Sequence, residues 1–226
     1  MMPYPPFPSE ISAGPIHIQI WGFFAALGFV LALKMALGRA YGAGIPKYLI
    51  WDLLILALVS MIAGGRLFHF LSMPDRDISA LAGIHGGFSL AGGAAAAGIA
   101  CLIYLRVKNL DSRKVFDCLT PGAIAALILA RVGCFLVNDH VGKATLMPWG
   151  IPYEDGPMRH PVALYEISFL LAMFFAIRRE ERETKSNGAL FILFSLPYAS
   201  FRVLADFLRC DDLPVCEARF SGLTAS

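Results

Sequence analysis

Six long apolar stretches constrain this chain more than any other feature of its 226-residue sequence. Each is close to the roughly 20 residues that an α-helix needs to cross a bilayer core about 30 Å thick. The stretches span residues 16–37, 49–70, 88–107, 115–137, 161–177 and 189–208. Because a helix satisfies its own backbone hydrogen bonds in lipid, the pattern predicts an all-α, polytopic membrane bundle with about six transmembrane helices.

The composition agrees with a membrane protein. Hydrophobic residues make up 57% of the chain and charged residues 16%, against roughly 45–50% and about 25% in soluble domains. This hydrophobicity also excludes a disordered chain, and a formal net charge of +2 gives no basic surface for nucleic acid. We therefore expect one membrane domain over residues 1–226, surrounded by membrane lipid and with no nucleic-acid partner.

The distribution of Lys and Arg predicts the orientation of the bundle, because cytoplasmic loops carry an excess of these residues. They are concentrated in the first, third and fifth loops between the apolar stretches, and residues 1–15 contain none. We therefore expect both termini to lie outside, as a leader at 1–15 and a tail at 210–226. The long loop at 138–160 then also lies outside, as a lid or an arm on the membrane surface.

Ionisable residues inside the spans are candidate functional groups, because each costs about 2.5–3.5 kcal/mol on insertion scales. They include Asp52, Arg66, Asp117, Arg131, Glu166, Arg202 and Asp206. The expected orientation places Arg66, Arg131 and Arg202 in the outer half of the bilayer. Glu166 and Asp206 lie at a similar depth and offset part of this charge. Since arginine binds phosphate oxygens bidentately, the set predicts an outer-leaflet phospholipid site.

These groups also have structural interpretations. A single arginine near a helix end commonly snorkels to the headgroups, and Asp52 and Asp117 suit helix caps or partners of cytoplasmic basic groups. The glycine-rich stretch 84–93 suits either a ligand that approaches exposed backbone N–H groups or close helix packing. Its glycines include Gly86, Gly87, Gly92 and Gly93.

The cysteines indicate no metal site. Cys101, Cys118 and Cys134 fall within predicted spans and suit packing as small apolar groups. Cys210 and Cys216 follow the last span, where an oxidising compartment would allow a local disulfide. No metal-ligand spacing, nucleotide-binding loop or serine nucleophile motif stands out, so we expect neither a metal nor another cofactor.

Several short motifs occur in a fixed order between about residues 14 and 209. They include Gly64-Gly65-Arg66, the stretch 86–93, Arg131-Val132-Gly133-Cys134-Phe135, Arg159-His160-Pro161 through Tyr165-Glu166, and Tyr198-Ala199-Ser200-Phe201-Arg202. Together they resemble the bacterial prolipoprotein diacylglyceryl transferase family. The resemblance implies an enzyme of the bacterial cytoplasmic membrane. Such an enzyme moves the diacylglyceryl group of phosphatidylglycerol to the lipobox cysteine in a prolipoprotein signal peptide, and glycerol phosphate leaves.

The resemblance also implies roles for individual residues. Arg131 and Arg202 would bind the phosphate as catalytic groups, with Arg66 supporting them. Asp139 takes the position of the family's signature glutamate. The further substrate-binding residues that it implies are Gly86, Gly87, Gly92, Gly93, Tyr165, Glu166, Tyr198 and Asp206.

The sequence also departs from the family pattern. The family's proposed base, a histidine, is replaced by Ala91, and the signature asparagine is replaced by Cys134. The family's further C-terminal span does not follow. His85 and His140 are the substitute candidates for the base, with a hydrogen-bonding surface histidine as the alternative interpretation of each. A second hypothesis is therefore a catalytically impaired paralogue that acts as a phospholipid-binding or assembly protein.

Overall fold

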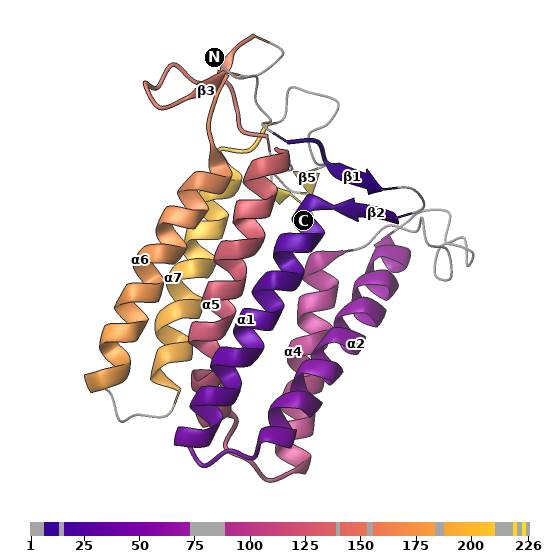
Figure 1. Ribbon diagram of the computed structural model, residues 1–226, viewed down its shortest axis with the longest axis vertical. Helices are drawn as coiled ribbons and strands as arrows, with labels where there is room; N and C mark the ends of the chain where they lie inside the picture. The colour runs from indigo at the N-terminus through magenta and orange to yellow at the C-terminus, as the bar shows by residue number, and fades with distance from the viewer. Residues whose placement is uncertain are drawn as a thin grey trace.

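The computed structural model is a bundle of long helices that run side by side, with short strands gathered at one end (Figure 1). The residues that it describes are 7–13, 16–72, 89–138, 141–152, 156–183, 188–210, 219–220 and 223–224. Its helices are α1 (Ile20–Gly42), α2 (Lys47–Ser72), α4 (Leu90–Val107), α5 (Ser112–Val137), α6 (Val162–Glu183) and α7 (Ala189–Asp206). Each overlaps one of the six predicted stretches, which confirms the predicted helical membrane bundle, but residues 16–19 of the first stretch form a strand rather than helix.

The helices differ in how well they suit a membrane span. α1, α2, α5 and α7 are long and apolar enough to cross a bilayer, and α4 is a shorter apolar helix. α6 begins apolar and ends in the charged run 178–183. Many large apolar side chains face outward, such as Val30, Ile55 and Phe175. This exposure is expected where lipid rather than water surrounds the helices.

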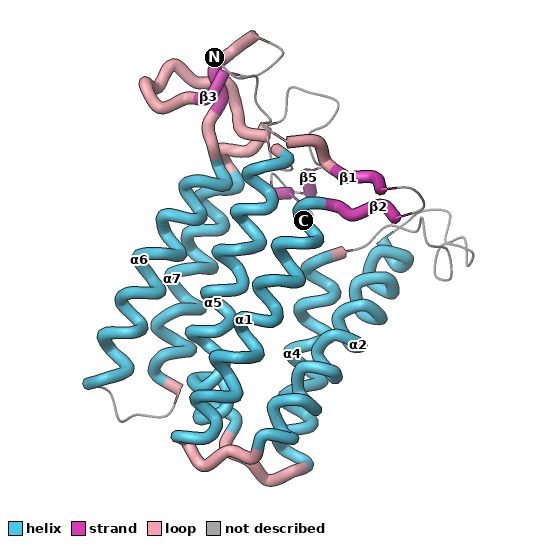
Figure 2. Tube along the Cα trace, viewed as in Figure 1, coloured by secondary structure: helices cyan, strands magenta, loops and turns pink. Residues whose placement is uncertain are grey.

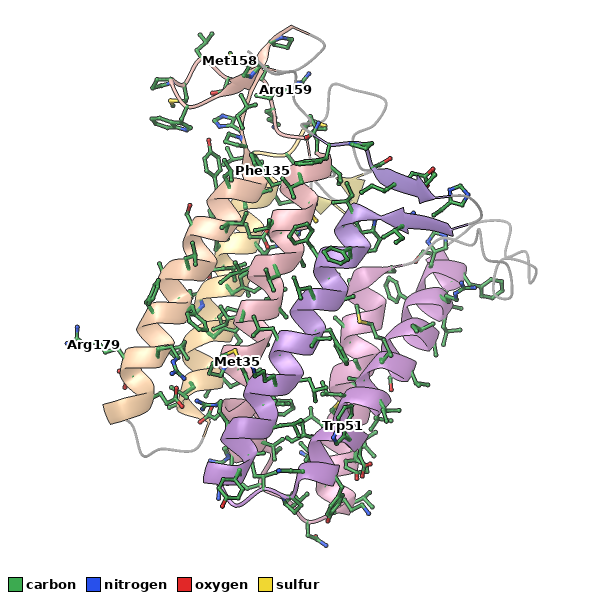
Figure 3. The ribbon with its side chains drawn as sticks, in the orientation of Figure 1. Met35, Trp51, Phe135, Met158, Arg159 and Arg179 are labelled. Carbon is green, nitrogen blue, oxygen red and sulfur yellow. The ribbon has the colours of Figure 1, made fainter. Side chains whose placement is uncertain are left out.

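The strands form small antiparallel pairs that the sequence analysis did not predict. They are β1 (Glu10–Ala13), β2 (Ile16–Gln19), β3 (Ile151–Pro152), β4 (Met158–Arg159), β5 (Arg219–Phe220) and β6 (Leu223–Thr224). All lie at one end of the bundle (Figure 2), which we call the hairpin end. The opposite end, which contains residues 43–46 and 108–111, is the loop end. Figure 3 shows Met158 and Arg159 at the hairpin end, and Trp51 on α2 toward the loop end.

Glycines let α1 and α5 approach closely. A Cβ at Gly28 would lie 2.8 Å from the Ala126 carbonyl oxygen, and one at Gly122 would lie 2.9 Å from the Ala32 carbonyl oxygen. Membrane helices commonly use small residues in this way, because van der Waals contact replaces the hydrophobic effect within lipid. The α1–α5 contact fixes the position of α5, which carries Arg131.

The same packing joins α2 to α4. A Cβ at Gly64 would lie 2.2 Å from Ala96 Cβ, and one at Gly92 would lie 2.2 Å from Phe68 Cβ. For Gly92, the structure therefore supports the interpretation as a helix-packing glycine.

Two buried apolar clusters organise the bundle. The first lies toward the loop end, where α1, α2, α4 and α5 meet around residues such as Ala40, Leu49 and Val115. The second joins α5, α6 and α7. Its buried members are Ile124, Leu170, Ile177, Leu190 and Phe194. The second cluster holds together the three helices that carry the candidate site.

Candidate functional site

A buried carboxylate, Glu166 of α6, lies at the centre of a polar cluster in the hairpin half of the bundle. Its Oε1 atom lies 2.9 Å from Arg131 Nε and accepts a 2.7 Å hydrogen bond from the Tyr198 hydroxyl. Its Oε2 atom accepts a 3.4 Å hydrogen bond from Arg202 Nη1. We call Arg131, Glu166, Tyr198 and Arg202 the Glu166 cluster. Since Glu166 is only 1% exposed, these partners replace the water that its charge has lost.

Three helices supply the Glu166 cluster. Arg131 comes from α5, and Tyr198 and Arg202 lie about one turn apart on α7. The Tyr198 ring stacks on Phe194 with centroids 5.2 Å apart and planes at 17°. Phe194 belongs to the apolar cluster that joins α5, α6 and α7. Apolar packing thus holds the Tyr198 hydroxyl toward the carboxylate.

The Glu166 cluster carries one more positive than negative charge, because two guanidiniums surround one carboxylate. Each guanidinium has five N–H donors. Contacts among the described residues use two nitrogens of Arg131 and one of Arg202. An excess cation away from water is costly unless an anion offsets it. The arrangement therefore suits a phosphate, which accepts paired N–H groups from arginine.

Cys134 adjoins this cluster. Arg131 Nη1 donates to Cys134 Sγ at 3.8 Å, and Cys134 is buried. The place of Cys134 in an apolar span predicts a packing role, and this contact with Arg131 was not expected. The signal for it was the spacing of three residues on one helix, which places two side chains on the same face.

A second group of buried charges lies closer to the hairpin end. It contains Arg159, Asp206 and Arg209, which are 1%, 5% and 3% exposed. Arg209 Nε lies 3.9 Å from Asp206 Oδ1. Arg159 Nη1 donates a 3.0 Å hydrogen bond to the Gly142 carbonyl. Arg159 and Arg209 were not candidates earlier because they lie just outside the apolar spans.

Backbone hydrogen bonds hold segment 141–145 of the long loop between the start of α6 and the end of α7. The Lys143 N–H donates to the Leu208 carbonyl at 2.9 Å, and the Lys143 carbonyl accepts from the His160 N–H at 3.0 Å. A Cβ at Gly142 would lie 2.0 Å from the His160 carbonyl oxygen. This close approach requires glycine, and it ties the loop to two helices of the site.

Tyr165 attaches a more distant part of the same loop. Its hydroxyl accepts a 2.8 Å hydrogen bond from Trp149 Nε1 and lies 3.0 Å from His160 Nδ1. Tyr165 lies in the first turn of α6, directly before Glu166 in the sequence. Its described hydrogen bonds therefore go to the long loop rather than to the Glu166 cluster.

Arg66 lies in another part of the bundle. It belongs to α2, which packs mainly against α4 and to a lesser extent against α1. Among the contacts that the structure describes, Glu166 joins Arg131 and Arg202, whereas Arg66 lies on α2. The sequence could predict a similar depth for all three, but not which helices are neighbours.

The remaining candidates either lie at the start of α4 or fall outside the residues that the structure describes. Gly92 and Gly93 lie in the first turn of α4, where both are buried and the Ser89 hydroxyl accepts a 3.3 Å hydrogen bond from the Gly92 N–H. Ala91, at the position of the family histidine, is exposed. The candidates that lie outside the described residues are His85, Gly86, Gly87, Asp139 and His140.

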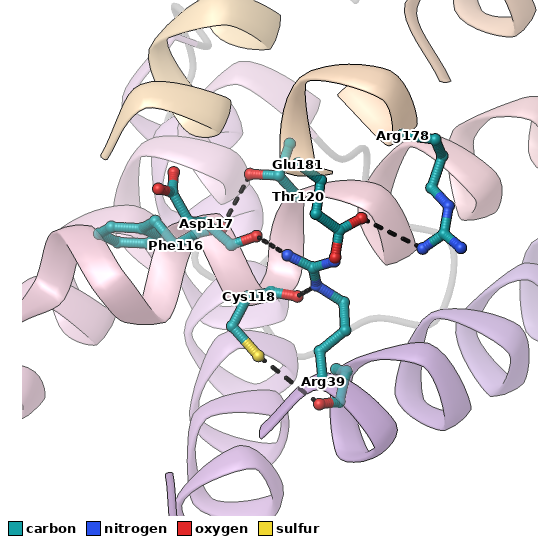
Figure 4. A network of polar contacts seen from close by, with 8 residues as sticks. Arg39, Phe116, Asp117, Cys118, Thr120, Arg178 and Glu181 are labelled. Atoms are coloured by element: carbon teal, nitrogen blue, oxygen red, sulfur yellow. Dashed lines mark hydrogen bonds and ion pairs between the residues drawn. The ribbon is translucent and has the colours of Figure 1, made fainter. Parts of the chain in front are cut away.

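The loop end holds a separate polar network (Figure 4). The Asp117 carboxylate accepts hydrogen bonds from the backbone N–H groups of Gly188 at 2.6 Å and Phe191 at 2.8 Å. Arg39 donates to the Asp117 carbonyl at 3.2 Å and forms an ion pair with Glu181. The prediction that Asp117 caps a helix is confirmed. Asp52, for which a similar role was predicted, accepts a hydrogen bond from Tyr104.

The cysteines behave partly as predicted. Cys101, Cys118 and Cys134 are free thiols, and Cys210 is disulfide-bonded. Cys216, the predicted partner, lies outside the described residues. Within the part of the chain that the structure describes, no group of three or more His, Cys, Asp or Glu side chains could hold a metal ion.

Comparison with known proteins agrees with the family resemblance of the sequence motifs. The sequence model of the family described as "Prolipoprotein diacylglyceryl transferase" matches residues 8–226. Relatives described as phosphatidylglycerol–prolipoprotein diacylglyceryl transferases include a Nitrosomonas europaea protein, 31% identical across 94% of this chain and 81% of its own length. One from Oleidesulfovibrio alaskensis is 31% identical across 99% of this chain and 88% of its own length. By this likeness over nearly its whole length, the chain belongs to the prolipoprotein diacylglyceryl transferase family.

Proposed function

We propose that this protein transfers the diacylglyceryl group of phosphatidylglycerol to the lipobox cysteine of prolipoproteins. The observation that carries the proposal is the buried Glu166 carboxylate, which holds Arg131 and Arg202 together in the hairpin half of the bundle. Family membership supplies the reaction, and this pair of arginines supplies a site for the phosphate that leaves.

The chemistry requires a group that stabilises negative charge. The cysteine thiol loses its proton, since the thiolate is the nucleophile. The thiolate sulfur attacks the glyceryl carbon, and the new C–S bond forms as the C–O bond to the phosphate breaks. The electron pair of that bond leaves with glycerol phosphate. Arg131 and Arg202 stabilise this developing anion, because their guanidinium donors are already held in place by Glu166 when the charge develops.

Glu166 positions these arginines rather than reacting. By binding both guanidiniums it fixes their separation and limits their mutual repulsion, and the Tyr198 hydroxyl fixes the carboxylate in turn. One positive charge remains for the phospholipid. On this basis Glu166 and Tyr198 serve the substrate-binding site as positioning residues, and we assign catalytic roles to Arg131 and Arg202.

The group that removes the thiol proton is a separate proposal. Ala91 provides no base on α4, so His85 and His140 remain the candidates. A second function follows from the same observation, because a protein without the base would bind phospholipid and transfer nothing.

We further propose that the hairpin end faces outward, with both termini outside. The concentration of Lys and Arg in the first, third and fifth loops supports this orientation. In this orientation the Glu166 cluster lies in the outer leaflet.

A transfer assay distinguishes the enzyme proposal from the proposal that the protein only binds phospholipid. Purified protein in phosphatidylglycerol nanodiscs is incubated with a lipobox peptide, and mass spectrometry follows the gain of one diacylglyceryl group. The enzyme proposal predicts product with the wild type and none with Arg131→Ala or Arg202→Ala. Arg179→Ala, which removes an exposed arginine near the loop end of α6, is the matched control and should retain activity. No product with the wild type, while phosphatidylglycerol still copurifies, would support the binding function instead.

The same assay tests the base. His85→Ala and His140→Ala are compared with the wild type at equal protein concentration. A loss of about 10²–10⁴-fold in rate identifies the general base. Full rates in both variants would remove these two histidines from the mechanism.

A further inference from the structure

Asp117 lies far from the Glu166 cluster, yet it joins two of the helices that form it. Asp117 belongs to α5, and the N–H groups that its carboxylate binds belong to the start of α7. The N-terminal residues of a helix have N–H groups without intrahelical partners. A side chain from the neighbouring helix therefore caps α7, because Gly188 at the N-cap has no side chain that could do so.

The spacing along the two helices is equal. Fourteen positions separate Asp117 from Arg131 on α5, and fourteen separate Gly188 from Arg202 on α7. Both helices run from the loop end to the hairpin end (Figure 1). At 1.5 Å per residue, each interval is about 21 Å long. The contact at Asp117 therefore sets the two helices in the register that brings Arg131 and Arg202 to the same level.

Apolar packing alone specifies this register weakly. The buried residues between α5 and α7 are aliphatic and aromatic, such as Ile124, Leu190 and Phe194. Apolar side chains of similar volume substitute for one another at low cost, and hydrogen bonds depend strongly on geometry. A carboxylate that binds two specific N–H groups thus selects one register among several that packing would permit.

The surroundings fix Asp117 itself. Pro121 lacks the N–H that would donate to the Asp117 carbonyl in a regular helix. Arg39 of α1 donates to this carbonyl instead, at 3.2 Å, and to the Cys118 carbonyl at 3.0 Å. Figure 4 shows the Arg39 guanidinium between these carbonyls and Glu181. The position of Asp117 is therefore set by α1 and α6 as well as by its own helix.

We infer that Asp117 is a positioning residue for the transfer reaction: it sets the register of α7 so that Arg202 and Tyr198 reach Glu166. This inference rests on the proposed function only for its effect on activity. A slip of α7 by one turn would displace Arg202 by 5.4 Å, beyond the reach of its 3.4 Å contact with Glu166. The site would lose one phosphate-binding arginine although no residue in it had changed.

The test compares Asp117→Ala with Asp111→Ala. Asp111 caps its own helix, α5, by accepting a 3.0 Å hydrogen bond from the Arg113 N–H. Both variants remove a capping carboxylate at the loop end, and among the contacts that the structure describes it is Asp117 that joins α5 to α7. We expect Asp117→Ala to lower kcat/KM for phosphatidylglycerol about 10- to 100-fold, mainly through KM. Asp111→Ala should remain within about twofold of the wild type. Asp117→Asn, which keeps one acceptor oxygen, should give an intermediate loss and serves where the alanine variant does not fold.

A second readout measures the register without activity. Phe169 of α6 and Phe201 of α7 stack with ring centroids 4.3 Å apart, so a short bifunctional thiol reagent should crosslink the pair Phe169→Cys and Phe201→Cys. Adding Asp117→Ala should reduce this crosslink, and adding Asp111→Ala should not. An unchanged crosslink with Asp117→Ala, or equal losses of activity from both aspartate variants, would overturn the inference. A wild type without transfer activity would overturn the proposed function alone, since the crosslink would still decide the register.

Discussion

The Tyr198 hydroxyl donates a 2.7 Å hydrogen bond to the same Glu166 oxygen that lies 2.9 Å from Arg131 Nε. A residue on α7 and a residue on α5 are thus joined through one atom on α6. This relationship makes the three helices a single unit around the proposed phosphate site. A change in any one of these contacts should therefore alter the geometry of the others.

Tyr198→Phe tests the smallest such change. The ring stays packed on Phe194, and one hydrogen bond to a buried charge is lost. Hydrogen bonds to charged groups are worth about 1.5–3 kcal/mol, so we expect the free energy of unfolding to fall by about that amount. The protein should keep part of its activity, because both arginines remain. Denaturant unfolding and the transfer assay measure the two effects, and full stability would show that the bond contributes nothing.

Glu166→Gln should give a larger effect with a distinctive rescue. The variant removes the only carboxylate of the Glu166 cluster and leaves two guanidiniums together away from water. Breaking a buried ion pair on one side costs about 3–5 kcal/mol. Because an anion can replace the lost charge, phosphatidylglycerol should raise the melting temperature of the variant more than that of the wild type. Equal shifts in the two proteins would contradict an anion site at Arg131 and Arg202.

Gly142→Ala tests the attachment of the long loop. The new Cβ would lie 2.0 Å from the His160 carbonyl oxygen, so the backbone bonds of segment 141–145 cannot form without movement. We expect lower thermal stability and a loss of transfer activity. Gly98→Ala is the matched control, since a Cβ there meets nothing within 4 Å and alanine favours a helix. Similar losses in both variants would show that the close approach at Gly142 is not responsible.

Cys134 offers a chemical probe of the site, because its sulfur lies 3.8 Å from Arg131 Nη1. A phosphate bound by Arg131 should cover this thiol. We therefore expect phosphatidylglycerol to slow the labelling of Cys134 by a small maleimide, as followed by peptide mass spectrometry. Cys101, a free thiol on α4, is the internal control and should label at the same rate with and without this lipid. Measurable labelling of Cys134 at equal rates with and without this lipid would place the headgroup elsewhere.

The positions of the helices could be predicted because each apolar stretch is long enough to span a bilayer. The choice of Arg131, Arg202 and Glu166 as site candidates followed from the cost of charge in lipid. Their association with one another did not follow, because apolar helices carry little information about which neighbours they have. Arg66 illustrates this limit: the depth predicted for it matches that predicted for Arg131, but it lies on α2, in another part of the bundle.

Two other features were beyond sequence analysis for different reasons. Arg159 is fully buried although it precedes the apolar start of α6, because segment 141–145 covers it and the Gly142 carbonyl accepts its hydrogen bond. Hydropathy describes burial in lipid and does not describe burial beneath a loop. The strands of the short pairs contain two to four residues each, which is at or below the shortest run in which an alternating pattern is recognised.

The central claim is that Arg131 and Arg202 together bind the phospholipid phosphate. Native mass spectrometry of protein released from phosphatidylglycerol nanodiscs tests it most directly, with Arg202→Ala, Arg131→Ala and the control Arg179→Ala compared with the wild type. We predict that the wild type and Arg179→Ala retain a bound phosphatidylglycerol and that both site variants lose it. Retention of the lipid by Arg131→Ala and Arg202→Ala at the wild-type level would contradict this account.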